Sequence, residues 1–182
     1  MRITSGQFRG TNLITPEDDS IRPTSDKARQ GIFNSILSGK YNFSLRGASV
    51  LDGTCGTGAM GIEALSRGAK FCHFVDQSQD SIALTRRNID KINIDKSRYQ
   101  ISTANVASLQ SDTAFDLVCL DPPYGQNLLP DMIAHILTLS GITDNTLFII
   151  EEDVRTHITV PLKVLDRKTY GAAQILYAKM PV

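Results

Sequence analysis

Residues 47–61 read GASVLDGTCGTGAMG, and this stretch decides the fold. A short apolar strand ends at Asp52, and a glycine-rich loop then leads into a helix that ends near Gly68. The same alternation continues along the chain, with further strands expected at 71–75, 99–103, 115–120, 146–150, 162–165 and 174–178, and further helices at 78–92 and 128–139. Strands that alternate with helices predict an α/β fold with a doubly wound, mostly parallel sheet.

Three of the expected strands end in an aspartate: Asp52, Asp76 and Asp121. Doubly wound sheets bind their ligands beyond the carboxyl ends of the strands. We therefore expect the functional site at this edge of the sheet.

The glycine-rich loop contains GTGAMG at 56–61, which matches the GxGxxG pattern of dinucleotide-binding loops. Asp52 argues against NAD, because a carboxylate at the entrance of the loop would face a pyrophosphate of like charge. The same carboxylate suits a ligand with a positive group, such as the amino group of S-adenosylmethionine. Asp76 is placed to accept hydrogen bonds from a ribose, and Asn105 to bind the edge of an adenine. Taken singly, both are also ordinary strand-end or turn residues.

The tetrapeptide Asp121-Pro122-Pro123-Tyr124 follows the fourth strand and is the strongest motif in the chain. Its two prolines fix two φ angles and remove two backbone donors, so that a carboxylate and several carbonyls form a stiff group of acceptors. A planar amine fits such a group, with its N–H groups held by the acceptors and its ring stacked on Tyr124. The alternative interpretation is a Pro-Pro turn with a capping aspartate.

Positive charge is concentrated in the first part of the chain. The 182 residues have a net charge of zero, whereas residues 1–46 carry seven basic and four acidic side chains. We expect residues 1–15 to form a short β-hairpin, followed by a helix. Arg2, Arg9 and Arg22 are then the natural ligands for nucleic-acid phosphates. We accordingly divide the chain into an N-terminal extension, residues 1–46, and a core domain, residues 47–182.

Composition excludes several classes of protein. No apolar run is long enough to cross a membrane, and the N-terminus lacks the apolar stretch of a signal peptide. The three cysteines show no CxxC spacing, which argues against a zinc site or a disulfide framework and for a reducing compartment. We expect a cytoplasmic monomer with no metal ion and no membrane partner.

With these motifs in view, the chain resembles the bacterial family of small-subunit (16S) rRNA guanine-N2 methyltransferases, which are class I S-adenosylmethionine-dependent enzymes. The resemblance runs almost from end to end and is most specific at residues 6–10, 22–26 and 61–67. It implies a seven-stranded, Rossmann-like sheet whose last strand is antiparallel. It also implies S-adenosylmethionine as methyl donor and S-adenosylhomocysteine as product.

The resemblance further implies roles for individual residues. Four residues of the loop region would bind the methionine portion of the cofactor: Asp52, Gly56, Thr57 and Gly58. Asp76 takes the ribose, Asn105 takes the adenine, and residues 121–124 take the target base. The chain departs from the family at Thr54-Cys55, where the family usually has Phe-Ala. This departure leaves backbone contacts unchanged but alters the packing around the cofactor.

The target base can be argued from its hydrogen-bond donors. Guanine presents N–H groups at both N2 and N1, which match a carboxylate such as Asp121, whereas adenine presents an N6 donor beside an N1 acceptor. This favours methylation of guanine N2 in 16S rRNA, either free or in an assembling small subunit. The alternative is an adenine-N6 methyltransferase acting on DNA or RNA. An NAD(P)-dependent oxidoreductase and a catalytically silent RNA-binding relative are less favoured.

Overall fold

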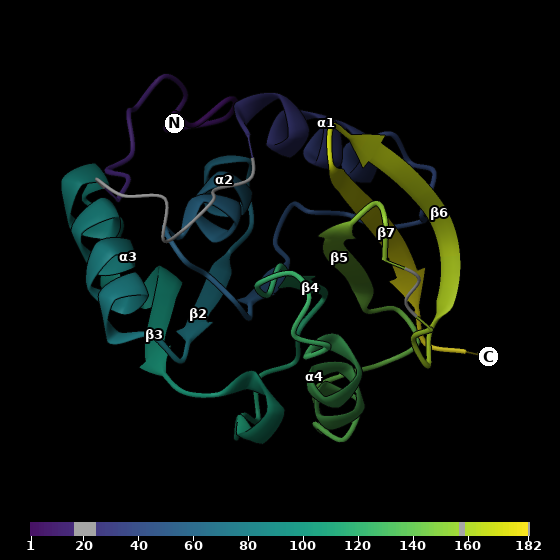
Figure 1. Ribbon diagram of the computed structural model, residues 1–182. Coiled ribbons are helices and arrows are strands. Elements are labelled where there is room, and N and C mark those ends of the chain that lie inside the picture. Colours follow the sequence, from purple (N-terminus) through teal and green to yellow (C-terminus); the bar gives the residue numbers. More distant parts are fainter. Residues whose placement is uncertain (17–24, 157–158, 182) are drawn as a thin grey trace.

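The structure is a computed structural model that describes residues 1–16, 25–156 and 159–181. Its strands form one sheet with helices on both faces (Figure 1). The strands are β1 (Ser49–Asp52), β2 (Phe71–Asp76), β3 (Tyr99–Thr103), β4 (Leu117–Leu120), β5 (Leu147–Asp153), β6 (Lys163–Tyr170) and β7 (Ala173–Lys179). The α-helices are α1 (Asp26–Leu37), α2 (Ala59–Ser66), α3 (Gln79–Ile92) and α4 (Leu129–Ile136), and short 3₁₀ turns occur at Lys96–Arg98 and Val106–Ser108.

The sheet has seven strands in the order β3-β2-β1-β4-β5-β7-β6. Strands β1 to β5 run parallel to one another, and β7 runs antiparallel to both β5 and β6. The doubly wound sheet and its antiparallel last strand are thus confirmed. The strand order reverses between β1 and β4, which is where such sheets open a crevice for ligands.

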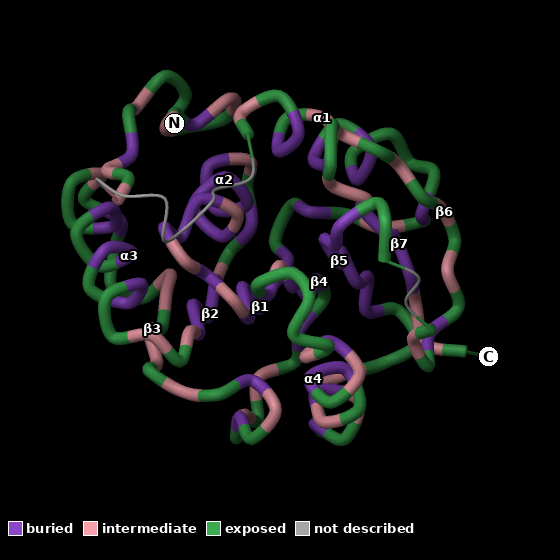
Figure 2. Tube along the Cα trace, in the orientation of Figure 1, coloured by how far each residue is buried: buried purple, intermediate pink, exposed green. Residues whose placement is uncertain are grey.

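Two apolar cores lie on opposite faces of this sheet, because neighbouring residues of a strand point to opposite sides. Val50 belongs to the core that includes residues of α1, α2 and α3, whereas Leu51 belongs to the core that includes residues of α4. Every residue of β1, β4 and β5 is buried, as expected for central strands covered on both faces (Figure 2). The central strands are therefore a rigid support for the residues at their ends.

The N-terminal segment folds back on itself as a short hairpin-like arm without regular strands. In residues 1–14, called the N-terminal arm below, an antiparallel bridge joins Arg2 and Asn12, and the Ile3 and Leu13 N–H groups donate across the arm to the Thr11 and Met1 carbonyls at 3.0 Å. The backbone N–H groups of Thr4 and Ser5 donate to the carboxylate of Glu63 on α2, at 2.8 and 3.1 Å. The arm therefore folds back on itself as expected, although it forms no regular strands, and α2 holds its turn.

Helix and strand boundaries lie close to those expected from the sequence, with one difference that affects the site. Strand β5 continues through Glu151 to Asp153, three residues beyond its apolar run, and all of its residues are buried. Helix α1 begins as its capping sequence suggests, since the Ser25 side chain accepts a hydrogen bond from the Ala28 N–H. None of the helices described is both long and apolar enough to cross a membrane.

Candidate cofactor and substrate site

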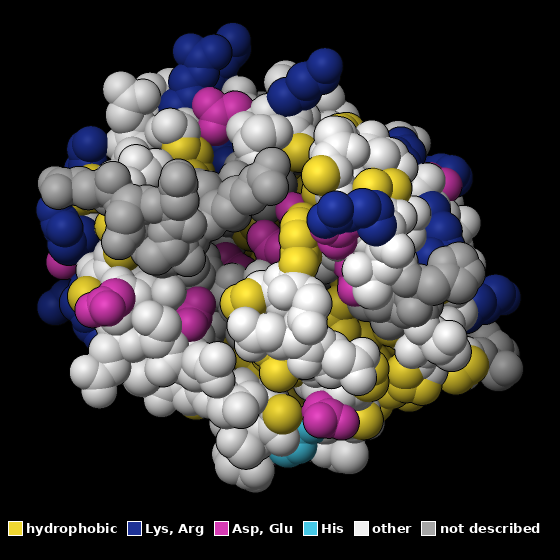
Figure 3. Space-filling model, in the orientation of Figure 1, with side chains coloured by type: hydrophobic (Ala, Val, Ile, Leu, Met, Phe, Trp, Pro, Cys, Tyr) yellow, Lys and Arg dark blue, Asp and Glu magenta, His cyan; other side chains and the backbone are white. Residues whose placement is uncertain are grey.

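A cavity of about 1090 Å³ opens at the carboxyl ends of the central strands. Figure 3 looks toward this face, where Asp and Glu side chains gather around a central hollow. The cavity has room for a ligand of cofactor size and a second group beside it. Nine of the residues predicted from the sequence line it: Asp52, Gly56, Thr57, Asp76, Asn105, Asp121, Pro122, Pro123 and Tyr124.

The glycine-rich loop forms one wall of the cavity. Gly56 and Gly58 have φ angles of +53° and +77°, which favour glycine because a Cβ is strained in this region. Gly58 does not line the cavity. Instead, it precedes α2, and a Cβ placed on it would come within 3.0 Å of Thr85. Gly58 therefore shapes the loop, whereas Gly56 and Thr57 face the ligand space.

Asp52 is the buried acid at the base of this wall, with 3% of its surface exposed. Its Oδ2 accepts a hydrogen bond of 2.9 Å from the Gly61 N–H in the first turn of α2. Burial raises the pKa of Asp52 to about 7, against the effect of the Gly61 N–H, and Asp76 contributes to the rise. A bound cation would favour the ionised form of this carboxyl group.

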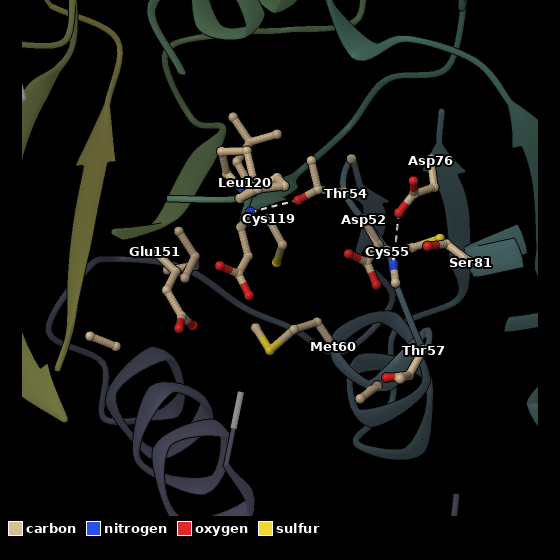
Figure 4. A pocket seen from close by; sticks show the side chains of 18 of the residues that line it. Asp52, Thr54, Cys55, Thr57, Met60, Asp76, Ser81, Cys119, Leu120 and Glu151 are labelled. Atoms are coloured by element: carbon tan, nitrogen blue, oxygen red, sulfur yellow. Dashed lines mark hydrogen bonds between the residues drawn. The ribbon is translucent and has the colours of Figure 1, made fainter. Parts of the chain in front are cut away.

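Asp76 and Asn105 continue the wall from β2 and β3. The Asp76 carboxylate accepts the Gly56 N–H at 3.0 Å and the Ser78 N–H at 2.9 Å, so it fixes the loop while it faces the cavity (Figure 4). Asn105 uses its Oδ1 to accept the Ala107 N–H at 2.9 Å, at the start of a 3₁₀ turn. Asn105 is thus a turn residue that also lines the cavity.

The Asp-Pro-Pro-Tyr segment forms the opposite wall. The Asp121 N–H donates to the Thr54 hydroxyl at 2.6 Å, so Thr54 ties the glycine-rich loop to this segment (Figure 4). The Tyr124 side chain is 37% exposed at the mouth, and its hydroxyl donates to Oε1 of Glu151 at 3.0 Å. Cys55, beside Thr54, is buried, and burial raises its thiol pKa well above the ordinary value, which disfavours the reactive thiolate.

Negative charge dominates the lining of the cavity. Among the described residues, five acidic side chains line it (Asp52, Asp76, Asp80, Asp121 and Glu151), against one basic side chain, that of Lys27. Anionic walls attract cations and repel phosphates. S-adenosylmethionine carries a sulfonium and an ammonium group, whereas NAD carries a pyrophosphate, so the charges fit the first ligand and not the second.

Arg2 and Arg9, two of the residues predicted to bind RNA, lie outside the cavity lining. The Arg2 side chain is 70% exposed, with its Nε 3.9 Å from Asp26, and Arg9 is exposed in the N-terminal arm. Arg22 lies outside the described residues. Asn88 also joins the arm to the glycine-rich loop. Its side chain accepts the Ile14 N–H and donates to the Ile14 carbonyl, and it donates to the Thr57 carbonyl at 2.9 Å.

Glu151 is the main cavity residue that sequence reasoning missed. It lies on β5, across the cavity from Asp52 and Asp76 in Figure 4. The sequence carried a signal for it, because an acidic residue follows the apolar run 146–150 just as aspartates follow three other strands. Within the described residues, no group of three or more Asp, Glu, His or Cys side chains is arranged to hold a metal ion.

Comparisons with known proteins agree with this geometry. The chain is 33% identical to a putative rRNA methyltransferase, YlbH, of Bacillus subtilis, with 98% of each chain covered. It is 29% identical to the ribosomal RNA small subunit methyltransferase D of Escherichia coli K12, covering 97% of this chain and 87% of that protein.

Solved structures show the same fold. A putative methyltransferase, yhhF, from Escherichia coli superposes with a TM-score of 0.82 at 26% identity, covering 100% of this chain and 99% of that one. A more distant protein of this fold, the magnesium protoporphyrin IX methyltransferase of Synechocystis, was solved with bound S-adenosylmethionine. Its TM-score is 0.63 at 17% identity, and the match covers 84% of this chain and 79% of that one.

The family model described as conserved hypothetical protein 95 matches residues 1–179. The chain therefore belongs to this family and has the fold of class I methyltransferases.

Proposed function

We propose that the protein transfers a methyl group from S-adenosylmethionine to the exocyclic N2 amine of a guanine in 16S rRNA, with S-adenosylhomocysteine as product. The observation that carries the proposal is one cavity with an acidic cofactor wall on one side and the Asp121-Pro-Pro-Tyr124 acceptors on the other. The relative from Escherichia coli named as a small-subunit rRNA methyltransferase supports the choice of RNA. Action on this RNA places the enzyme in the cytoplasm, and we expect a monomer.

The cofactor wall fits the chemistry of the methyl donor. Asp52 and the loop residues Gly56 and Thr57 hold the methionine portion, with Gly58 fixing the shape of the loop. Asp76 takes the ribose hydroxyls and Asn105 the adenine end. When bound, the cofactor supplies a methyl group that its sulfonium already activates. The protein therefore has no need of a nucleophilic side chain.

The substrate wall holds the amine for direct attack. The Asp121 carboxylate and the Pro122 carbonyl accept the two N–H groups of guanine N2, which keeps the nitrogen lone pair directed at the methyl carbon. Asp121 would accept one N–H proton as the bond between N2 and the methyl carbon forms and the bond between that carbon and the cofactor sulfur breaks. Holding two reactants in line lowers the activation free energy of a reaction of this type by up to about 7–11 kcal/mol. The target base must lie in a loop or be flipped out, because the amine is otherwise paired.

Methyl transfer from tritiated S-adenosylmethionine to unmodified small-subunit rRNA, free or partly assembled, tests the proposal. We expect label in N2-methylguanosine after nucleoside digestion. Label in N6-methyladenosine would instead establish the adenine alternative, and binding of NAD(P) in place of S-adenosylmethionine would refute a methyltransferase. The variant Asp121→Ala should lose on the order of 100-fold in methyl transfer while it still binds S-adenosylmethionine. The matched control is Asp112→Ala, at an exposed position outside the cavity lining.

A further inference from the structure

Glu151 and Asp121 both belong to the cavity lining. Strands β4 and β5 pair so that Cys119 lies opposite Ile149, and both of these residues line the cavity. Because side chains alternate along a strand, Glu151 projects to the same side as Ile149, and Asp121 directly follows the last residue of β4. Both residues line the cavity, so a carboxylate just past the end of β4 and one on the neighbouring strand β5 face the substrate space.

Tyr124 connects Glu151 to the position of the target base. Its hydroxyl donates to Glu151 Oε1 at 3.0 Å, and Glu151 is only 8% exposed. A base stacked on the Tyr124 ring therefore lies close to the Glu151 carboxylate. A carboxylate accepts up to about four hydrogen bonds, so Glu151 can hold Tyr124 and a donor of the base at the same time.

Two neighbouring carboxylates match the Watson–Crick edge of guanine. This edge presents the N1–H and the N2 amino group side by side, and both are donors, whereas carboxylates only accept. Adenine places an acceptor at N1, which would face carboxylate oxygens without a hydrogen between them. Two buried acceptors that face each other without a hydrogen bond cost free energy of binding, so the arrangement selects for a base with an N1–H.

We propose that Glu151 is a specificity-determining residue that accepts the N1–H of the target guanine while Asp121 accepts an N2–H. The inference rests on the proposed guanine-N2 activity and extends it from one carboxylate to two. It assigns to Glu151 a role in choosing the base, beyond its structural role in holding Tyr124.

An RNA that carries 2,6-diaminopurine at the methylated position tests this role. The analogue keeps the N2 amine and the ring for stacking, but its N1 is an acceptor. We expect the wild type to prefer guanine by on the order of 100-fold in kcat/KM. In Glu151→Gln this ratio should fall at least tenfold, because the glutamine amide can donate to the acceptor N1. Each ratio is measured within one preparation, so a partly unfolded variant does not distort it.

Two matched variants separate base selection from support of Tyr124. Tyr124→Phe removes the hydrogen bond to Glu151 but keeps the ring and the carboxylate, so rates for both bases should fall while their ratio stays within about threefold of the wild type. Glu152→Gln makes the same change at the next position, whose side chain is not part of the cavity lining, and should keep the wild-type ratio.

The possible results are distinct. If Glu151→Gln slows both bases equally or leaves the guanine preference intact, the inference is overturned, while formation of N2-methylguanosine by the wild type leaves the proposed function standing. If the wild type forms no N2-methylguanosine, the proposed function and this inference both fail. A loss of guanine preference confined to Glu151→Gln supports the inference.

Discussion

We expect the buried carboxyl group of Asp52 to make cofactor affinity depend on pH. Its pKa in the free protein is raised to about 7, mainly by burial, so the group is protonated at lower pH. A cationic ligand favours the ionised form, and binding below pH 7 must therefore release a proton. We expect the affinity for S-adenosylmethionine to fall by up to about tenfold per pH unit from pH 7 to pH 5.

Calorimetric titrations at several pH values, in buffers of different ionisation enthalpy, would measure this proton release. Asp52→Asn carries no titratable group at this position, so its affinity should be weaker at pH 7 and nearly constant down to pH 5. An equally steep pH dependence in Asp52→Asn would show that another group is responsible.

Most of the candidate site residues could be predicted because ligand-binding residues in this fold lie at the carboxyl ends of the strands. Asp52, Asp76 and Asp121 each follow an apolar run, and the structure brings all three to one cavity. Glu151 was missed because the apolar run before it suggested that the strand had already ended, whereas β5 continues in buried acidic residues. Burial of such residues depends on the neighbouring strands and helices, and no local pattern reveals it.

The element that holds the N-terminal arm to the core is α2, through its buried Glu63. This carboxylate accepts hydrogen bonds from the Thr4 hydroxyl at 2.7 Å, Arg29 at 3.3 Å and Arg67 at 2.7 Å, in addition to two backbone N–H groups of the arm. The side chains of Glu63 and Arg29 have no exposed surface. Removing one charge from a buried ion pair leaves the partner's charge poorly compensated.

We expect Glu63→Gln to lower the free energy of unfolding by about 3–5 kcal/mol, as measured by urea denaturation. The control is Lys40→Met, which removes an exposed ion pair of 2.7 Å with Asp166 and should cost at most about 1 kcal/mol. Equal losses in the two variants would mean that the Glu63 cluster does not hold the arm.

The contact between the N-terminal arm and α2 could not be predicted from the sequence. The hydrogen-bond partners of Thr4 and Ser5 lie on Glu63, 59 and 58 residues away in the sequence. Hairpin signals are local, so they predict that the arm folds back on itself but not that a distant carboxylate accepts its Thr4 and Ser5 N–H groups. By contrast, the strand–helix alternation of the core comes from repeating local patterns, and its topology could be predicted.

Across the whole molecule, acidic and basic side chains are unevenly distributed, although the net charge is zero. Carboxylates predominate in the cavity lining, while most of the Lys and Arg side chains visible in Figure 3 lie toward the edge of this face. So few basic residues in the N-terminal arm predict weak, salt-sensitive binding of free RNA. Shape, or proteins already bound to the RNA, must then supply the remaining specificity.

Arg9→Ala tests whether the arm contacts RNA. We expect a higher KM for rRNA and a salt dependence of log K that is shallower by about one unit of slope, with the affinity for S-adenosylmethionine unchanged. The control is Lys163→Ala, an exposed basic residue on β6 at the other edge of the sheet. The same slope in Arg9→Ala as in the wild type would remove Arg9 from the RNA-binding surface. Point substitutions suit this test better than deleting the arm, because Ile3 is fully buried in the core.

Asn88 connects the two proposed binding surfaces, the N-terminal arm and the glycine-rich loop. Its hydrogen bonds join Ile14 at the end of the arm to the Thr57 carbonyl in the cofactor loop, so a ligand that orders one segment also restrains the other. Coupling of this kind is reciprocal. If bound S-adenosylmethionine raises the affinity for RNA by some factor, bound RNA must raise the affinity for S-adenosylmethionine by the same factor. An Asn88→Ala variant would lower these two coupling factors equally.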